Sequence, residues 1–168
     1  MRTVVPVADD DRGFFAELAA PFGPVTVVCG ERGVRRIHIG DAGSLDSGEM
    51  HSLVERPRHA EVSTAVRQLR EYLAGRRTTF DLSLDLHGTP FQVAVWRSLA
   101  RVPFGRTSTY AAQARSVGRP RAVRAVGSAN GRNPVPIVLP CHRIIASDGT
   151  DRKSTRLNSS HEWISRMP

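Results

Sequence analysis

A cysteine that is followed directly by a histidine and an arginine stands near the end of the chain, in the sequence Pro140-Cys141-His142-Arg143. The thiolate is the nucleophilic form of cysteine, so a reactive cysteine needs a base within reach and an electropositive setting. His142 can supply the base, and Arg143 can supply positive charge. These residues also fit an inert buried thiol beside a packed histidine, and the short motif alone leaves both readings open.

The residues before Cys141 are rich in proline. Pro134, Pro136 and Pro140 follow Gly131 and Asn133 within ten residues. Because proline fixes φ and lowers the entropy of the unfolded chain, this composition predicts a rigid, irregular segment. We expect residues 137–139 to form a buried extended stretch leading to Cys141. Such rigidity suits a reactive side chain that must be held still, and it favours the nucleophile.

Three short helices are predicted upstream of this segment. Thr89 and Pro90 are a typical helix start, and the apolar stripe of the first helix is Phe91, Val95, Leu99 and Val102. Gly118 separates two further helices, at residues 110–117 and 120–129, in the manner of a helix-turn-helix. The last helix carries Arg121 and Arg124. Paired short helices also occur in ordinary bundles, so the motif alone is a weak signal.

Positive charge is concentrated in the same part of the chain. The 168 residues have a formal net charge of +8, and residues 90–150 hold nine arginines and one acid, Asp148. Residues 1–89 hold 11 arginines and 13 acids. A basic segment of this kind predicts a polyanionic partner, most commonly nucleic acid. The alternative is a solvated, arginine-rich surface without a polyanion.

The N-terminal half reads as a small sheet with one helix. Residues 25–29 and 34–39 are rich in β-branched side chains and predict a hairpin. Residues 80–86 alternate between apolar and polar side chains and predict a third strand. Apolar residues recur at helical spacing over residues 59–74, and Gly75 should end that helix. We expect residues 41–57 to be a loop.

The two cysteines, Cys29 and Cys141, are far apart and indicate neither a disulfide framework nor paired metal ligands. No apolar run reaches the length of a membrane span, and the acidic start is unlike a signal peptide, so we expect a cytoplasmic protein. Residues 151–168 contain the only lysine, Lys153, and show no clear amphipathic period. We interpret them as a non-native extension; the alternative is a genuine, poorly ordered tail.

Residues 133–145, NPVPIVLPCHRII, resemble the active-site signature of the O6-alkylguanine-DNA alkyltransferases, also called methylated-DNA–protein-cysteine methyltransferases. The resemblance extends to residues 121–130, 104–110 and 88–92, and more loosely over residues 22–150. It implies an α+β fold. A ribonuclease-H-like subdomain with a small antiparallel sheet would occupy residues 1–88. A winged-helix-like helix-turn-helix domain that binds the minor groove of DNA would occupy residues 89–150.

The resemblance also implies roles for individual residues. Cys141 matches the acceptor that takes the alkyl group from guanine O6, in a single turnover that consumes the protein. His142 matches its base, Asn133 the side chain that braces the segment, and Tyr110 a phenol that contacts DNA and donates to the guanine ring. Arg124 matches the arginine that replaces the extruded nucleotide in the duplex. The other DNA-binding residues expected are Arg121, Ala122, Ala125, Gly127 and Arg143.

The chain departs from the family pattern after Gly149. The family continues with a glycine-rich loop and a helix whose glutamate orients the histidine, whereas Glu162 stands in a different context. We therefore expect an incomplete relay on His142 and impaired activity. Cys29 and His38 do not match the zinc ligands of some members, so we predict no metal. The resemblance implies no cofactor, a monomer, and double-stranded DNA with O6-alkylguanine as the substrate. The sequence leaves activity on O4-alkylthymine open.

The sequence is also compatible with two other functions. A non-catalytic protein could recognise alkylated DNA without repairing it, but the binding-only relatives of the family lack the acceptor cysteine that Cys141 supplies. A Cys-His hydrolase is the weaker alternative, because no oxyanion-hole glycine motif accompanies Cys141.

Overall fold

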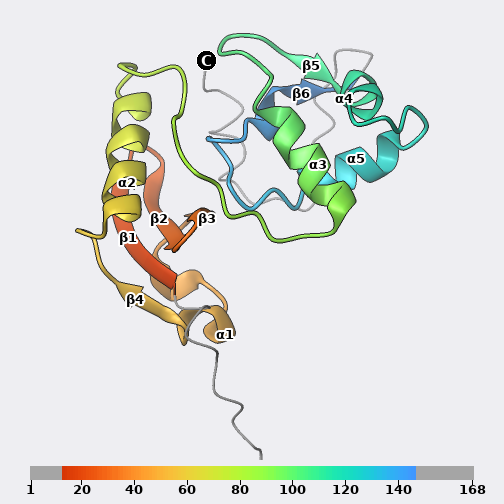
Figure 1. Ribbon diagram of the computed structural model, residues 1–168. Coiled ribbons are helices and arrows are strands. Elements are labelled where there is room, and N and C mark those ends of the chain that lie inside the picture. The colour runs from red at the N-terminus through yellow and green to blue at the C-terminus, as the bar shows by residue number, and fades with distance from the viewer. Residues whose placement is uncertain (1–12, 147–168) are drawn as a thin grey trace, which may run out of the picture. The chain divides into compact units, whose positions relative to one another are not determined.

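The computed structural model describes residues 13–146, which fall into two units that divide between Asp85 and Leu86 (Figure 1). Residues 151–168, which we interpreted as a non-native extension and which include Lys153 and Glu162, lie outside the described residues. The acidic residues near the N-terminus also lie outside them. Within the described part, none of the helices has the length and apolar character that crossing a membrane requires.

The N-terminal unit is built on a four-stranded sheet of order β3-β2-β1-β4. Its strands are β1 (Gly13–Ala20), β2 (Gly23–Gly30), β3 (Gly33–Ile39) and β4 (Leu53–Glu55). The predicted hairpin is confirmed as the antiparallel pair β2 and β3. The sheet is mixed rather than antiparallel, because β4 runs parallel to β1. Sequence patterns missed β1, since its segment GFFAELAA lacks β-branched residues and is rich in alanine and leucine.

Residues 41–57 are more ordered than the predicted loop. They contain the short 3₁₀ helix η2 (Ala42–Ser44), the helix α1 (Ser47–Met50) and the strand β4. Ala42 and Leu45 are buried in a cluster with Phe15 and Val28. A few apolar residues in a polar segment are therefore enough to pack it against the sheet, which explains why composition alone predicted a loop.

The predicted helix is confirmed as α2 (Ala60–Leu73), and it packs against the sheet (Figure 1). Its buried face contains Val62, Val66 and Leu69. Gly75 follows the helix with φ of +69°, a left-handed conformation that glycine adopts without steric cost. Periodicity and the terminal glycine thus identified this element correctly.

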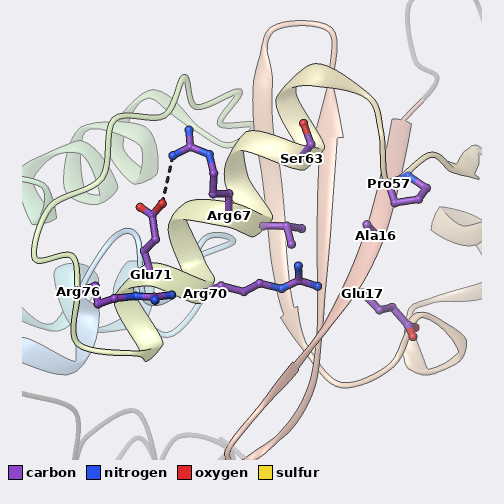
Figure 2. Close-up of a pocket in the computed structure, with 9 residues that line it drawn as sticks. Ala16, Glu17, Pro57, Ser63, Arg67, Arg70, Glu71 and Arg76 are labelled. Carbon is purple, nitrogen blue, oxygen red and sulfur yellow. Dashed lines mark hydrogen bonds and ion pairs between the residues drawn. The ribbon is translucent and has the colours of Figure 1, made fainter.

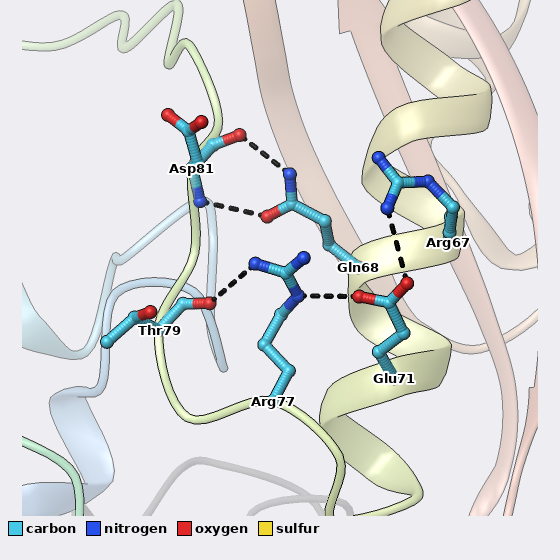
Figure 3. A network of polar contacts seen from close by, with 6 residues as sticks. All are labelled: Arg67, Gln68, Glu71, Arg77, Thr79 and Asp81. Carbon is cyan, nitrogen blue, oxygen red and sulfur yellow. Dashed lines mark hydrogen bonds and ion pairs between the residues drawn. The ribbon is translucent and has the colours of Figure 1, made fainter.

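The strand predicted at residues 80–86 is reduced to a single bridge to the hairpin, in which Val34 N donates to Ser83 O and Asp85 N donates to Val34 O, each at 2.9 Å. Only Leu84 forms a bridge, to Val34 of β3. The backbone of Asp81 is occupied by the Gln68 side chain, whose Nε2 donates to Asp81 O at 2.7 Å and whose Oε1 accepts from Asp81 N at 2.9 Å (Figure 3). A buried amide on α2 therefore takes the hydrogen bonds that a neighbouring strand would otherwise make.

Ion pairs fix the turn between α2 and this segment. The Nε of Arg77 lies 2.8 Å from Glu71 Oε2, and an Arg77 Nη donates to the carbonyl of Thr79 at 3.1 Å (Figure 3). Arg67 contacts the other oxygen of Glu71 at 3.2 Å. The hydrogen bond from Arg77, with support from Arg67, lowers the pKa of Glu71, so this carboxylate stays ionised at neutral pH.

Residues 86–146 of the C-terminal unit form three α-helices, a short 3₁₀ helix and a two-stranded sheet. The helices are α3 (Pro90–Leu99), α4 (Tyr110–Ser116) and α5 (Val123–Asn130), and the strands are β5 (Ser108–Thr109) and β6 (Ile144–Ile145). α3 and α4 confirm their predictions: α3 begins with a capping box between Thr89 and Gln92, and Gly118 follows α4 with φ of +71°.

Two features of this unit differ from the sequence prediction. α5 begins at Val123 rather than near residue 120, because the chain first makes a turn in which Ala122 N donates to Arg119 O at 2.9 Å. The parallel pair of β5 and β6 was not predicted, since two-residue strands carry no readable period. The strand pair joins the segment after Cys141 to the segment before Tyr110.

The core of the C-terminal unit lies between its three helices. Val95, Ala114, Val126 and Ala129 are buried together, with Tyr110 packed against them. Small side chains allow the helices to approach closely, and Trp96 Nε1 donates to Ala129 O at 2.8 Å inside this core. The arrangement of paired helices beside a short sheet fits the winged-helix-like fold that the resemblance implied.

Candidate active site and DNA-binding surface

Cys141 is the first residue of the 3₁₀ helix η3 (Cys141–Arg143). Its backbone N–H donates to Leu139 O at 2.8 Å, and Arg143 N donates to Pro140 O at 3.0 Å. Only 9% of Cys141 is exposed. The thiol is thus held in a tight turn with limited access to solvent.

The segment before Cys141 is a turn, not the predicted extended stretch. Leu139 N donates to Val135 O at 2.9 Å, which closes the turn around Ile137. Ile137 has φ of +74°, a left-handed conformation that is unfavourable for a β-branched residue. Such a conformation costs about 1–3 kcal/mol and persists only where surrounding structure requires it. Here the Ile137 side chain is buried, with 2% exposed, and two prolines restrict the neighbouring backbone.

The side chain of Asn133 connects the two ends of this turn. Its Nδ2 donates to Leu139 O at 2.7 Å, and its Oδ1 accepts from Val135 N at 3.1 Å. A hydrogen bond from the same side chain acts on the Cys141 thiol. Asn133 and Cys141, which the sequence proposed for one site, therefore lie together, and Asn133 holds the segment that carries the thiol.

The two cysteines differ in environment. Burial raises the pKa of the Cys141 thiol, while the Asn133 side chain and the backbone N–H groups of Cys141 and His142 act in the opposite direction. Cys29 lies inside β2 with 0% exposed, and burial together with the nearby charge of Glu61 raises its pKa to about 12. Only Cys141 has groups around it that stabilise a thiolate.

This difference predicts selective labelling by iodoacetamide. Cys141 should react faster as pH rises from about 6 to about 9, since below its pKa each pH unit raises the thiolate fraction roughly tenfold. Cys29 should stay unlabelled until the protein is unfolded. Peptide mass spectrometry after timed labelling measures both rates, with unfolded protein as the control. Equal labelling of the two thiols in the folded protein would contradict this description.

His142 and Tyr110 lie in the same unit as Cys141. His142 follows Cys141 in η3 and is half-buried. Tyr110 is the first residue of α4, where the side chain of Thr109 accepts from Ala112 N at 3.1 Å. A Cβ atom on Gly127 would lie 3.8 Å from the Tyr110 ring, so the tyrosine packs directly over the glycine in α5.

The outer face of α5 carries positive charge without acids. Arg124 and Ala125 are exposed on it, Arg121 is exposed in the turn before it, and Ala122 and Gly127 are half-buried. Its first turn contains no acidic residue, so the helix N-terminus and the arginines present one sign of charge. This surface is chemically suited to phosphate.

Arg143 differs in placement from the other predicted DNA-binding residues. Only 8% of it is exposed. One of its Nη atoms donates to Val102 O at 3.4 Å, and the guanidinium lies over the Phe104 ring, 5.2 Å from its centroid. In this conformation Arg143 joins the turn after α3 to the segment that carries Cys141.

The N-terminal unit has a shallow hollow of its own, about 330 Å³ in volume, between β1 and α2. Figure 2 shows Arg67 paired with Glu71 at its rim and Arg70 extending along it. None of the predicted site residues lines it. Over residues 13–146 there is also no group of three or more His, Cys, Asp or Glu side chains arranged to hold a metal ion.

Two buried amides near the site were not identified from the sequence. Gln113 in α4 and Asn130 at the end of α5 hydrogen-bond to each other, with 4% and 5% of these residues exposed. Gln113 lies three residues after Tyr110, and Asn130 lies three residues before Asn133. The sequence did contain one signal for this pair. Gln113 is a polar residue on the inward face of α4, at a position where the helical period predicts an apolar side chain.

These features define a class of protein: an α+β unit joined to a helix-turn-helix unit that carries a buried cysteine, a half-buried histidine next to it in the sequence, and a helix with an exposed arginine. Comparison with known families agrees with this class. Residues 14–86 match the ribonuclease-like domain of 6-O-methylguanine DNA methyltransferase, and residues 90–165 match its DNA-binding domain.

Individual proteins give the same result. The constitutive methylated-DNA–protein-cysteine methyltransferase of Bacillus subtilis is 39% identical over 135 residues, covering 80% of this chain and 82% of that protein. The crystal structure of Mycobacterium tuberculosis O6-methylguanine methyltransferase superposes with a TM-score of 0.80 at 34% identity, covering 92% and 90% of the two chains. The M. tuberculosis protein in complex with DNA superposes with a TM-score of 0.72 at 36% identity, covering 83% and 82%.

The chain belongs to the 6-O-methylguanine DNA methyltransferase family, the methylated-DNA–protein-cysteine methyltransferases. It is a DNA-binding enzyme that repairs DNA by transferring an alkyl group to a cysteine.

Proposed function

We propose that Cys141 is the acceptor cysteine and that O6-alkylguanine in double-stranded DNA is the substrate. The observation that carries this proposal is the Asn133 side chain, which fixes both ends of the turn before Cys141 and acts to lower the pKa of its thiol. Cys29, by contrast, is fully buried in β2 and has a pKa raised to about 12. A nucleophile must be accessible and ionisable. Burial raises the pKa of both thiols, but only at Cys141 do the Asn133 side chain and backbone N–H groups oppose that rise, and Cys141 is the more exposed of the two.

The reaction is a displacement at the alkyl carbon. His142 takes the thiol proton, through a water in the pattern that the family resemblance implies, and leaves the Cys141 thiolate. Its sulfur attacks the alkyl carbon in line with O6, so a carbon–sulfur bond forms while the carbon–oxygen bond breaks. The electron pair of the broken bond remains on the guanine, which takes up a proton and leaves as a neutral base. The thioether is stable, so each protein reacts once.

Tyr110 acts on the leaving group. A phenol that donates to the guanine ring stabilises the negative charge that develops there as the bond to O6 breaks. Its place at the N-terminus of α4, packed over Gly127 of α5, supports this role, because the tyrosine then lies beside the helix proposed to contact DNA.

DNA contacts are proposed for the exposed face of α5, in the minor groove. Arg124 fills the space that the extruded nucleotide leaves, and Ala122, Ala125 and Gly127 allow the helix to approach the groove closely. Arg121 contacts phosphate. The Arg143 side chain points inward, to Val102 O and the Phe104 ring. We therefore propose that Arg143 contributes to DNA repair indirectly, by holding the segment that carries Cys141 in place. We also propose that the protein acts as a monomer in the cytoplasm.

Stoichiometry tests this proposal. A duplex with one radiolabelled O6-methylguanine, added in excess, should transfer one methyl group per protein molecule and then no more. Methyl transfer that continues beyond one equivalent would contradict the suicide reaction, and tight duplex binding without any transfer would indicate recognition without repair. A second duplex with O4-methylthymine measures whether that base is also a substrate.

The substitution Asn133→Ala should slow transfer and shift its pH profile. Loss of the Asn133 hydrogen bond removes a group that lowers the pKa of Cys141, so the thiolate should form at a higher pH. Below the pKa, a rise of one unit reduces the thiolate roughly tenfold, and loosening of the turn adds to that loss. Single-turnover rates as a function of pH measure the effect. An unchanged profile with normal folding would show that Asn133 does not act on the thiol.

A further inference from the structure

We infer that the buried amide pair of Gln113 and Asn130 is a positioning device for the transfer reaction. It sets the placement of Tyr110, the proposed donor to the base, relative to Cys141, the proposed nucleophile. The inference rests on those two proposed roles. Gln113 and Asn130 lie outside the signature around Cys141, and the proposed function gives them no contact with the substrate.

The pair is fully embedded in hydrogen bonds. Asn130 Nδ2 donates to Gln113 Oε1 at 2.7 Å, and Gln113 Nε2 lies 3.3 Å from Asn130 Oδ1. The same Nε2 lies 3.0 Å from Ser98 Oγ and 3.1 Å from Val95 O, so the pair is also tied to α3. The three polar side chains are each at most 8% exposed. A buried polar group with several hydrogen bonds favours one geometry, because a shift weakens bonds that water cannot replace.

The surroundings of the pair are apolar. The core between the three helices consists of valine and alanine side chains, with Tyr110 and two further apolar residues packed against it. Apolar contacts between small residues are not directional, so they allow α4 and α5 to slide against each other at small cost. The amide pair is directional. It therefore supplies the register between α4 and α5 that the apolar core leaves poorly specified.

Each amide is connected to one of the two reacting groups. Gln113 lies three residues after Tyr110, on the same face of α4. Asn130 ends α5, and its carbonyl accepts from Asn133 N at 3.1 Å. Asn133 in turn holds the turn that leads to Cys141. A continuous series of hydrogen bonds therefore connects α4, which carries Tyr110, to the segment that carries Cys141.

Transfer from guanine requires both groups in place at once, whereas alkylation of the thiol by a small reagent requires only the thiol. Misplacement by about 1 Å reduces the rate of an oriented reaction by as much as roughly a hundredfold. We therefore expect loss of the pair to slow transfer from DNA by about tenfold or more. Alkylation of Cys141 by iodoacetamide should change by less than about threefold, since it does not depend on Tyr110.

The test variant is the full chain with Gln113→Met and Asn130→Leu, which replaces both amides by apolar side chains of similar size. Replacing both partners leaves no unpaired buried group, so this double variant should stay folded. Gln68→Met is the matched control: it removes a buried amide by the same kind of substitution, but in the N-terminal unit and outside the proposed site, and it should keep both rates. If the double variant does not fold, Gln113→Glu retains the acceptor for Asn130 while removing the Nε2 donor, and the same two rates are compared.

A second comparison separates positioning from a structural role. In a Tyr110→Phe background the phenol is absent, so the double substitution should slow transfer by less than about threefold, well below its effect in the wild-type background. Equal losses in both backgrounds, a parallel loss of iodoacetamide reactivity, or a double variant with the wild-type transfer rate would each overturn the inference. Failure of the proposed acceptor role would be seen separately, as transfer that survives Cys141→Ser.

Discussion

Replacing Cys141 with serine is expected to abolish alkyl transfer while leaving binding to DNA intact. A serine hydroxyl retains the size and the hydrogen-bonding capacity of the thiol, but it is not ionised at neutral pH and is a far weaker nucleophile without strong activation. We expect transfer to fall by roughly a thousandfold or more, below detection in a single-turnover assay. DNA affinity should change little, because Cys141 is only 9% exposed and the substitution removes no positive charge.

The matched control for this substitution is Cys29→Ala. Cys29 lies inside β2, where alanine removes one buried sulfur atom and no charge. We expect a modest loss of stability and a transfer rate within about twofold of wild type. Transfer that survives Cys141→Ser and disappears with Cys29→Ala would reverse the proposed assignment of the acceptor.

Replacing Arg124 with alanine is the second large effect expected, and it should depend on the form of the DNA. Extrusion of a base from a duplex costs a few kcal/mol, and a side chain that enters the vacated stack offsets part of this cost. A loss of about 1.5–3 kcal/mol corresponds to roughly 10- to 100-fold slower transfer from duplex DNA. Transfer from a single-stranded oligonucleotide, where no base must be extruded, should stay within about threefold of wild type.

Arg121→Ala is the control for Arg124→Ala, since it removes the same charge from the neighbouring turn. Loss of a phosphate contact should weaken DNA binding and reduce the slope of log K against log salt concentration by about 1. The rate of the transfer step should change equally for duplex and single-stranded DNA. Stopped-flow fluorescence of a base analogue beside the lesion can follow extrusion directly. If Arg124→Ala slows both forms of DNA equally, Arg124 is a phosphate contact and not a replacement for the extruded nucleotide.

Features that depend on local chemistry were predictable from the sequence. The start of α3 at Thr89 and Pro90, the end of α2 before Gly75 and the hairpin of β2 and β3 follow from capping, backbone freedom and β-branched residues. The proximity of Asn133 to Cys141 also followed from the motif, because the two residues belong to one short segment. These signals act over a few residues and do not depend on the rest of the fold.

Features that depend on distant partners were not predictable. Residues 80–86 have the alternation of a strand, yet the Gln68 side chain takes the hydrogen bonds of Asp81. Residues 137–139 are apolar and follow prolines, yet Asn133 and a buried Ile137 force them into a turn. At Asp81 the competing side chain comes from α2, whereas at residues 137–139 it comes from Asn133 within the same segment and acts together with the burial of Ile137. Such competition is decided by tertiary packing, and period or propensity does not reveal it.

The buried amides illustrate the same limit within the site. Gln113 interrupts the apolar face of α4, which indicates a partner without identifying it. Only the fold places Asn130 opposite it, at 2.7 Å between Nδ2 and Oε1. The residues that perform chemistry are concentrated in one motif, whereas the residues that position them are distributed over three helices.

The most direct test of the account is to locate the transferred methyl group. The protein is incubated with duplex DNA that contains O6-methylguanine, digested, and the peptides that carry Cys29 and Cys141 are analysed by tandem mass spectrometry. We expect one methyl group, on the sulfur of Cys141, in an amount equal to the methyl lost from the DNA. A methyl group on Cys29, on another residue, or on no residue while the DNA is demethylated would contradict it.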